Sequence, residues 1–334
     1  METTHTPSSE YAVSAHGLVK RFGDFTAVDG VDLDVRRGEI FGVLGPNGAG
    51  KTTTLKMLAT LLPLDAGEAS IFGVDVAREP HRIRQLIGVT GQYASVDENL
   101  TALENLRLFG RLQGLSGGAA RKVAGELLER FSLEEAADRP LAKFSGGMRR
   151  RLDLAASLIT RPPLIFLDEP TTGLDPRTRG EMWDTIRDLV ASGCTVLLTT
   201  QYLDEADQLA DRIAVIDRGS KVAEGTPDEL KSLVGSSTLQ LELTERESLP
   251  AAADLVRRSL GVDPVLSPER SRINVPLSDA DDAAGLLIGL REARIGLAGM
   301  SLSRPSLDEV FMTLTGHDAG DQNDTDTNPE SEVA

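Results

Sequence analysis

A glycine-rich loop near the start of the chain carries the residue types that bind a triphosphate. Its residues are Gly45, Pro46, Asn47, Gly48, Ala49, Gly50, Lys51 and Thr52, with Thr53 next in the chain. They match the pattern G-x-x-x-x-G-K-[ST], in which backbone N–H groups and the start of a helix surround phosphate oxygens. The lysine then reaches the terminal phosphates, and the threonine hydroxyl faces Mg²⁺. The run predicts an ATP site, although a glycine-rich loop also matches this pattern occasionally by chance.

Two acidic residues, Asp168 and Glu169, directly follow an apolar run over residues 164–167. An apolar run that ends in two acids is common, and it is often a strand that meets solvent. Downstream of a phosphate-binding loop, however, a carboxylate at this position helps to hold Mg²⁺. We therefore expect Asp168 and Thr52 to be magnesium ligands. Glu169 is placed to orient or deprotonate the attacking water, so Glu169 and Lys51 are candidate catalytic residues.

A third short motif, Ser145, Gly146 and Gly147, lies shortly before the acidic pair. Its glycines expose backbone donors at the start of a helix, which is another anion-binding arrangement. The same three residues are often a turn or a linker. A helical pattern continues through residues 148–159, so we interpret the motif as the beginning of a helix.

These motifs are expected at the ends of buried strands in an α/β domain. Apolar runs predict the strands, and periodic runs between them predict helices. The predicted strands are 40–44, 164–167, 195–199 and 213–216, and the predicted helices include 51–62 and 182–190. Strands that alternate with helices predict a mainly parallel sheet. Short strands are expected across residues 11–43, and mostly helical structure across about 93–160.

The chain is expected to form two domains with polar segments at both ends. Residues 11–235 make up the larger, nucleotide-binding domain. Near residue 236 the pattern restarts with an alternating strand, which begins a run of three strands and two helices and predicts a small α+β domain over 236–316. Residues 1–10 and the acidic tail 317–334 are polar and are expected to be disordered.

Charge and composition exclude several classes of function. The net charge is −17, and six of the acids lie in the tail 317–334, which contains no Lys or Arg. The rest of the chain therefore carries −11, which argues against nucleic acid as a partner. The first residues lack the features of a secretory signal, and no apolar stretch approaches the roughly 18 residues that span a bilayer. Any membrane role is therefore expected to be peripheral, through a partner. The single cysteine, Cys194, fits a reducing compartment.

The three motifs, in this order, resemble the nucleotide-binding subunit of ATP-binding-cassette (ABC) transporters. The resemblance covers residues 11 to about 230. It implies an ATPase with the P-loop ABC fold, which has a mainly parallel sheet core, an antiparallel β subdomain and a helical subdomain at about 93–160. It also implies that ATP and Mg²⁺ are the ligands of the site.

Further site residues follow from this resemblance. Residues 144–148 look like the ABC signature, with Phe144 where the family usually has leucine. Phe22 falls where the family stacks an aromatic ring on adenine, although packing in the core also accounts for a phenylalanine there. Gln92 corresponds to the glutamine that contacts Mg²⁺ and water and signals to the membrane subunit. Asp175 lies in the segment that corresponds to the D-loop.

Gln201 departs from the family pattern, because the family normally has a histidine here that contacts the γ-phosphate. The four histidines of the chain are His5, His16, His81 and His317, and none has a suitable position. A glutamine can donate a hydrogen bond to a phosphate oxygen, but it cannot become cationic. Either Gln201 is a catalytic residue that acts as a neutral phosphate sensor, or the site hydrolyses ATP slowly.

Within the family, the sequence is similar to the ATP-binding subunits of exporters for antibiotic self-resistance, of the daunorubicin/doxorubicin type. The similarity rests on residues 201–211, on the extra C-terminal domain and on residues 305–311. It implies export of a drug-like compound through a separate membrane permease, at the cytoplasmic face of the cell membrane. It also implies a homodimer, in which each ATP lies between the phosphate loop of one copy and residues 145–147 of the other.

Alternatives remain at this point. The apolar residues Leu307, Val310, Phe311 and Leu314 form a helical stripe that suits either a core or a partner contact. The transported substrate could be a lipid or a polysaccharide instead of a drug. A soluble ABC ATPase of translation or DNA repair usually has two cassettes or a long coiled coil, and neither is present. A regulatory subunit that only holds ATP would not need both Asp168 and Glu169.

Overall fold

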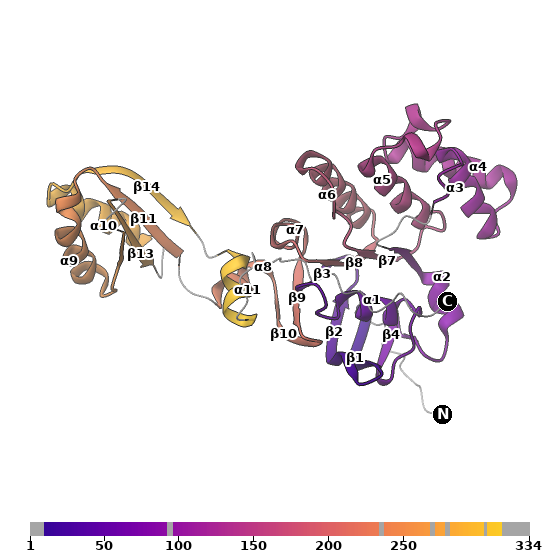
Figure 1. Ribbon diagram of the computed structural model, residues 1–334, viewed down its shortest axis with the longest axis horizontal. Coiled ribbons are helices and arrows are strands. Elements are labelled where there is room, and N and C mark those ends of the chain that lie inside the picture. Colours follow the sequence, from indigo (N-terminus) through magenta and orange to yellow (C-terminus); the bar gives the residue numbers. More distant parts are fainter. Residues whose placement is uncertain are drawn as a thin grey trace, which may run out of the picture. The chain divides into compact units, whose positions relative to one another are not determined.

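The computed structural model describes residues 10–91, 96–233, 237–267, 271–277, 281–303 and 306–315 (Figure 1). Its contacts divide the chain into two compact units, Met1–Pro227 and Asp228–Ala334. This division falls a few residues before the domain boundary that the sequence predicted after residue 235. The segments expected to be disordered lie outside the described residues, except for Glu10.

A six-stranded sheet forms the centre of the first unit. Its strands, in spatial order, are β10 (Ser220–Gly225), β9 (Arg212–Asp217), β3 (Ile40–Leu44), β8 (Thr195–Thr200), β7 (Leu164–Asp168) and β6 (Ile87–Thr90). All neighbours pair in parallel except β10, which is antiparallel to β9. β3 and β7 are buried along their whole length, as expected of apolar strands covered on both faces. The predicted mainly parallel α/β core is confirmed, and all four strands named from the sequence are present.

An antiparallel sheet packs near this core and accounts for the start of the chain. Its strands, in spatial order, are β2 (Phe25–Arg36), β1 (Tyr11–Phe22), β4 (Ala66–Ile71) and β5 (Val74–Asp75). The sequence predicted only short strands here, whereas β1 and β2 have 12 residues each. Irregular register in the β1–β2 pairing interrupts the alternation of apolar residues that would have revealed their length. Helix α1 (Lys51–Leu58) shares an apolar core with both sheets, and α2 (Pro80–Leu86) follows β5.

Helices form the rest of the first unit. They are α3 (Ala102–Leu112), α4 (Gly117–Arg130), the short turns η1 (Glu134–Ala136) and η2 (Leu141–Lys143), α5 (Gly146–Ser157), α6 (Pro176–Ala191) and α7 (Leu203–Leu209). Thr101 and Glu104 form a reciprocal capping box at the start of α3, which fixes where this helical region begins. Residues of α3, α4 and α5 share one apolar core with α6, β7 and β8. The helical region expected at about 93–160 is therefore present within the described residues.

The second unit contains a four-stranded antiparallel sheet, and helices α9 (Leu249–Leu260) and α10 (Asp281–Glu292) cover one face of it. Its other elements are α8 (Pro227–Ser232), β11 (Ser237–Leu243), η3 (Arg246–Ser248), β12 (Val265–Ser267), β13 (Arg272–Leu277), β14 (Leu297–Ser303) and α11 (Leu307–Thr315). The spatial order of the strands is β12, β13, β11, β14. The sequence missed β12, because a three-residue strand carries too little periodicity to be recognised.

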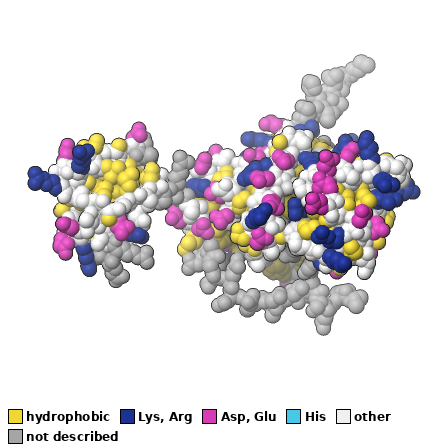
Figure 2. All heavy atoms as spheres, turned by 90° about the horizontal axis from the view of Figure 1, so that it is seen from above, with side chains coloured by type: hydrophobic (Ala, Val, Ile, Leu, Met, Phe, Trp, Pro, Cys, Tyr) yellow, Lys and Arg dark blue, Asp and Glu magenta, His cyan; other side chains and the backbone are white. Residues whose placement is uncertain are grey.

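The apolar core of the second unit follows from alternation along its strands. Leu239, Leu241 and Leu243 of β11 are buried, whereas the residues between them are only half-buried. These leucines pack with α9 and α10. Figure 2 shows hydrophobic side chains gathered on one face of this unit, and its large exposed apolar side chains include Met300 and Leu302. The helical stripe predicted near the end of the chain is present as α11.

Candidate nucleotide site

The phosphate-binding loop follows β3 and ends where α1 begins at Lys51. Gly50 precedes the helix with φ 99°, and a Cβ atom there would lie 2.4 Å from the carbonyl oxygen of Ala27. At Gly45 a Cβ atom would lie 2.2 Å from the carbonyl oxygen of Ile216. Both positions therefore require glycine, the first for its conformation and for lack of space, the second for lack of space. The loop is built so that its backbone lies close to neighbouring strands.

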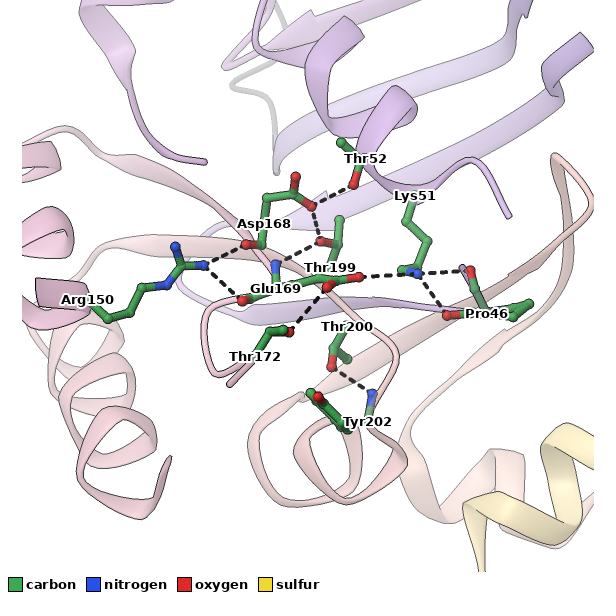
Figure 3. Close-up of polar contacts among 11 residues, drawn as sticks. Pro46, Lys51, Thr52, Arg150, Asp168, Glu169, Thr172, Thr199, Thr200 and Tyr202 are labelled. Carbon is green, nitrogen blue, oxygen red and sulfur yellow. Dashed lines mark hydrogen bonds and ion pairs between the residues drawn. The ribbon is translucent and has the colours of Figure 1, made fainter. Parts of the chain in front are cut away.

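Lys51 is buried at the centre of the site. Its Nζ atom donates to the carbonyl oxygens of Gly45 at 2.9 Å and Pro46 at 3.0 Å (Figure 3). It also lies 3.6 Å from Oε1 of Glu169. Burial lowers the pKa of Lys51, and the nearby carboxylates of Glu169 and Asp168 oppose this shift. The lysine is thus held at the loop by groups that phosphate oxygens are able to replace.

Asp168 and Thr52 face each other from β7 and α1. The hydroxyl of Thr52 donates to Oδ1 of Asp168 at 2.9 Å, and Thr199 of β8 donates to the same oxygen at 2.6 Å. Mg²⁺ prefers such hard oxygen ligands, and it usually takes one or two carboxylates together with waters and substrate phosphates. The Thr52 hydroxyl and the Asp168 carboxylate therefore fit Mg²⁺ that arrives with a nucleotide.

Glu169 follows in a left-handed backbone conformation with φ 47°, which is uncommon for a residue with a side chain. Its N–H donates to the carbonyl oxygen of Thr199 at 3.1 Å. The hydroxyl of Thr172 donates to its Oε2 atom at 3.2 Å. Such conformations persist where surrounding contacts hold them, and they cluster at functional sites. The carboxylate of Glu169 is therefore fixed close to Lys51.

The carboxyl end of β8 brings a second polar segment to this edge of the sheet. The carbonyl oxygen of Thr200 accepts from Gly45 N at 3.3 Å, which ties the phosphate-binding loop to β8. The hydroxyl of Thr200 accepts from Tyr202 N at 3.0 Å (Figure 3). Gln201 lies between these residues and is half-buried. Since β3, β8 and β7 are parallel neighbours, Gln201, Lys51 and Asp168 come from the same edge of the sheet.

The Ser-Gly-Gly motif begins α5 and faces solvent in part. Ser145 caps the helix by accepting from Met148 N at 3.3 Å, and both Ser145 and Gly146 are exposed. A Cβ atom at Gly147 would lie 2.2 Å from Cγ2 of Thr178 in α6, so this position requires glycine. The motif is a helix start and not a linker, as the sequence predicted.

Of the three remaining predicted site residues, two lie among the described residues. Asp175 caps α6 and accepts from the backbone of Arg177 and Thr178, and hydrogen bonds from Thr178 lower its pKa. Phe22, at the end of β1, is 48% exposed, so packing in the core does not account for it. Its ring lies 5.7 Å from Nζ of Lys20. Gln92 lies outside the described residues.

Sequence analysis did not identify two residues that hold the backbone and side chains of the site in place. Thr199 bonds both Asp168 and the backbone of Glu169. A threonine at the end of a buried apolar strand is a weak signal, because β-branched residues favour strands in any case. Arg150 of α5 also contacts this backbone. No local pattern distinguishes it from its two neighbouring arginines.

Comparison with known proteins agrees with this geometry. Residues 28–172 match the ABC transporter family, and residues 225–315 match the C-terminal domain of DrrA1-3-like ATP-binding proteins. A daunorubicin/doxorubicin resistance ATP-binding protein of Streptomyces peucetius is 52% identical over 97% of this chain and 98% of its own length. A Nod factor export ATP-binding protein I of Ralstonia nicotianae is 42% identical over 92% of this chain and 95% of its own.

A solved structure extends the comparison. A dimeric ATP-binding cassette in a post-hydrolysis state, bound to ADP and Pi, superposes with a TM-score of 0.59 and 29% identity. The match covers 64% of this chain and 98% of that one. No helix among the described residues is long and apolar enough to cross a membrane.

Fold, site and relatives together define the class as an ATP-binding cassette that hydrolyses ATP in a transporter. The chain belongs to the ABC transporter ATP-binding proteins, among which the daunorubicin/doxorubicin resistance proteins are about half identical to it over most of its length. The resemblance, the fold and the ATPase activity inferred from the sequence are thereby confirmed. Subunits of this kind work with a membrane permease and form dimers.

Proposed function

We propose that this chain powers the export of a drug-like compound, such as an anthracycline-type antibiotic, through a separate membrane permease. Support comes from the resistance proteins named above, which match almost the whole chain, including its C-terminal domain. The Nod factor export protein is less similar and supports a second candidate, export of a compound such as a Nod factor. A soluble ATPase without a permease has no relative of comparable similarity among these proteins.

The buried pair of Lys51 and Glu169 carries the proposed chemistry. When ATP binds, Lys51 exchanges its carbonyl partners for oxygens of the terminal phosphates, and the loop N–H groups of residues 45–53 surround them. Thr52, Asp168 and Gln92 would hold Mg²⁺, which neutralises charge that develops on the phosphates. Phe22 is exposed at the end of β1, where its ring would stack on adenine beside Lys20.

Hydrolysis then needs one proton transfer. Glu169 accepts a proton from water as the water oxygen bonds to the γ-phosphorus. The bond to the oxygen that bridges the β- and γ-phosphates breaks, and ADP and phosphate leave. Gln201 donates a hydrogen bond to the γ-phosphate as a neutral sensor. The 3.6 Å separation of Glu169 and Lys51 already places base and phosphate ligand side by side.

A second copy of the chain completes each site. Ser145 and Gly146 are exposed at the start of α5, where their backbone donors are free to meet the γ-phosphate bound to a partner. Asp175, at the start of α6, would lie in the segment between the two copies. The homodimer would bind the permease at the cytoplasmic face of the membrane as a peripheral subunit. ATP binding then closes the dimer, and hydrolysis opens it.

Turnover of the chain purified with its permease tests the proposal. We expect Glu169→Gln to lower ATP turnover by at least about 100-fold while ATP still binds, because a general base contributes about that much. Glu181→Gln, at an exposed site on α6, serves as the control and keeps turnover. Anthracyclines should stimulate the wild type only when the permease is present. Unchanged turnover in Glu169→Gln would remove the assigned base, and stimulation by a Nod factor but not by anthracyclines would favour the second candidate.

A further inference from the structure

Three consecutive arginines on α5 have different surroundings. Arg149 forms an ion pair with Glu98, with Nη1 2.6 Å from Oε1. Arg151 donates to the carbonyl oxygen of Phe131 at 3.3 Å, within the helical region. Arg150 instead extends toward the end of β7 (Figure 3). One residue of the three therefore reaches the backbone of the nucleotide site.

The guanidinium of Arg150 contacts four backbone carbonyl oxygens. Nη2 donates to Asp168 at 2.8 Å and to Glu169 at 2.8 Å, and Nε donates to Pro170 at 3.0 Å. Nη1 donates to Gly91 at 2.7 Å, on the segment that follows β6. A guanidinium has five N–H donors in a planar fork and no acceptor, so it suits a cluster of carbonyls. A lysine ammonium is a single point with three donors and cannot reproduce this arrangement.

The contacts matter because Glu169 has the unusual φ of 47°. This conformation turns the carbonyl oxygens of three successive residues, 168 to 170, toward one donor group. Without that donor, the three oxygens would lose their shared partner in a largely buried place, and the hydrogen bonds of Glu169 with Thr199 and Thr172 would have to hold the positive φ without it. Relaxation of the backbone to negative φ would move the Glu169 carboxylate relative to Lys51.

We propose that Arg150 is a positioning residue that holds the backbone of Glu169 in its left-handed conformation and so aims the base at the attacking water. The inference rests on the proposed role of Glu169 and extends it to a residue that touches no substrate. It also has a consequence for the dimer. Arg150 lies on the helix whose cap is Ser145, so one helix connects the surface offered to a partner copy with the backbone of the base and with Gly91.

Four single variants, in the full chain with its permease, test the proposal. They are Arg150→Gln, Arg150→Lys, Arg149→Gln and Arg151→Gln, each measured for kcat, for ATP affinity and for thermal unfolding. We expect Arg150→Gln to lower kcat by about 10- to 100-fold, because small misplacements of a catalytic group cost up to that much, while ATP affinity changes less than threefold. Arg150→Lys should recover part of the loss. Arg149→Gln and Arg151→Gln should stay within about twofold of the wild type.

A double variant separates this proposal from the proposed function. If Arg150 acts through Glu169, adding Arg150→Gln to Glu169→Gln causes no further loss of kcat. Additive losses would overturn the positioning role, and so would an Arg150→Gln variant that matches the two controls. If Arg150→Gln does not fold, Arg150→Lys decides, because a folded lysine variant with unchanged kcat also overturns the proposal. An unaffected Glu169→Gln single variant would instead contradict the proposed function itself.

Discussion

The two units of the chain differ in whether they bury polar side chains. Every buried polar or charged side chain among the described residues lies in the first unit, and several of them surround the phosphate-binding loop. In the second unit the buried cluster consists of apolar side chains, from Leu239 to Ile295. Burial of a polar group costs free energy unless hydrogen bonds or charges compensate. The first unit therefore depends on hydrogen bonds and ion pairs to offset this cost where its chemistry lies, whereas the core of the second unit is stabilised by apolar burial.

The contrast predicts that variants in the first unit alter chemistry and that variants in the second alter stability. We expect the largest effect from Lys51→Ala, with turnover lowered about 100- to 1,000-fold, the usual result of removing one charged donor from a transition state. ATP affinity should fall as well, because Lys51 contacts the terminal phosphates. Turnover and the binding of a fluorescent ATP analogue measure both.

Lys56→Ala is the matched control for Lys51→Ala. Lys56 lies on the same helix, in the last turn of α1. It should change turnover less than twofold, because the first turn alone faces the site. Equal losses in the two variants would show that α1 is merely destabilised, and the contrast between the units would fail at its strongest point.

In the second unit the corresponding variant is Leu241→Ala. Leu241 is fully buried in the apolar core, and its truncation should destabilise this unit by about 3 kcal/mol. ATP affinity should stay within twofold, because the nucleotide ligands all lie in the other unit. Chemical unfolding followed together with nucleotide binding tests both statements. Met300→Ala, at a 62% exposed position, should unfold like the wild type.

The sequence revealed the parts of the site that depend on local spacing. Two short motifs at the ends of strands could be recognised directly. They are the loop from Gly45 to Thr52 and the acidic pair Asp168 and Glu169. The mainly parallel core followed for the same reason. Turn chemistry alone could not have shown that Gly147 must be glycine, since the constraint comes from Thr178 on another helix.

Groups that act across the fold were not predictable in this way. The four carbonyl oxygens around Arg150 come from two segments that are distant in sequence from α5. The left-handed φ of Glu169 arises from its neighbours and not from its residue type. Sequence reasoning likewise assigned no role to Glu205, which is buried on α7. Such positions depend on tertiary contacts, which one sequence does not display.

Replacement of Gln201 is predicted to lower turnover less than replacement of Lys51 does. We expect Gln201→Ala to lower turnover about tenfold, which corresponds to loss of one hydrogen bond of about 1.4 kcal/mol to the γ-phosphate. ATP affinity should change less than turnover, because most phosphate contacts come from the loop. Gln201→His offers a second measurement, since a histidine can also become cationic. Unchanged turnover in Gln201→Ala would remove this residue from the mechanism.

Glu205 is a buried carboxyl in the first unit that lies outside the predicted ligand set. Its Oε1 atom accepts from the Thr171 hydroxyl at 2.8 Å and from the Trp183 indole at 3.2 Å. Burial raises its pKa above the ordinary value of 4.5, and hydrogen bonds from Thr200, Thr171 and Trp183 oppose this shift. As the pH rises above the ordinary pKa of 4.5, Glu205 loses its proton in the unfolded chain before it does so in the folded chain. The free energy of unfolding therefore falls as the pH rises.

Glu205→Gln removes this titration while keeping an oxygen for Thr171 and Trp183. The Tm of the variant relative to the wild type should therefore rise as the pH increases from about 5 to about 8. Thermal unfolding at several pH values measures the difference. Asp204→Asn, at an exposed neighbour on α7, should change it much less, because an exposed carboxylate keeps its hydration in the folded state. A Tm difference that is constant with pH would mean that burial of Glu205 costs no folding free energy. Hydrogen bonds would then fully compensate the burial of this carboxyl, which lies away from the nucleotide.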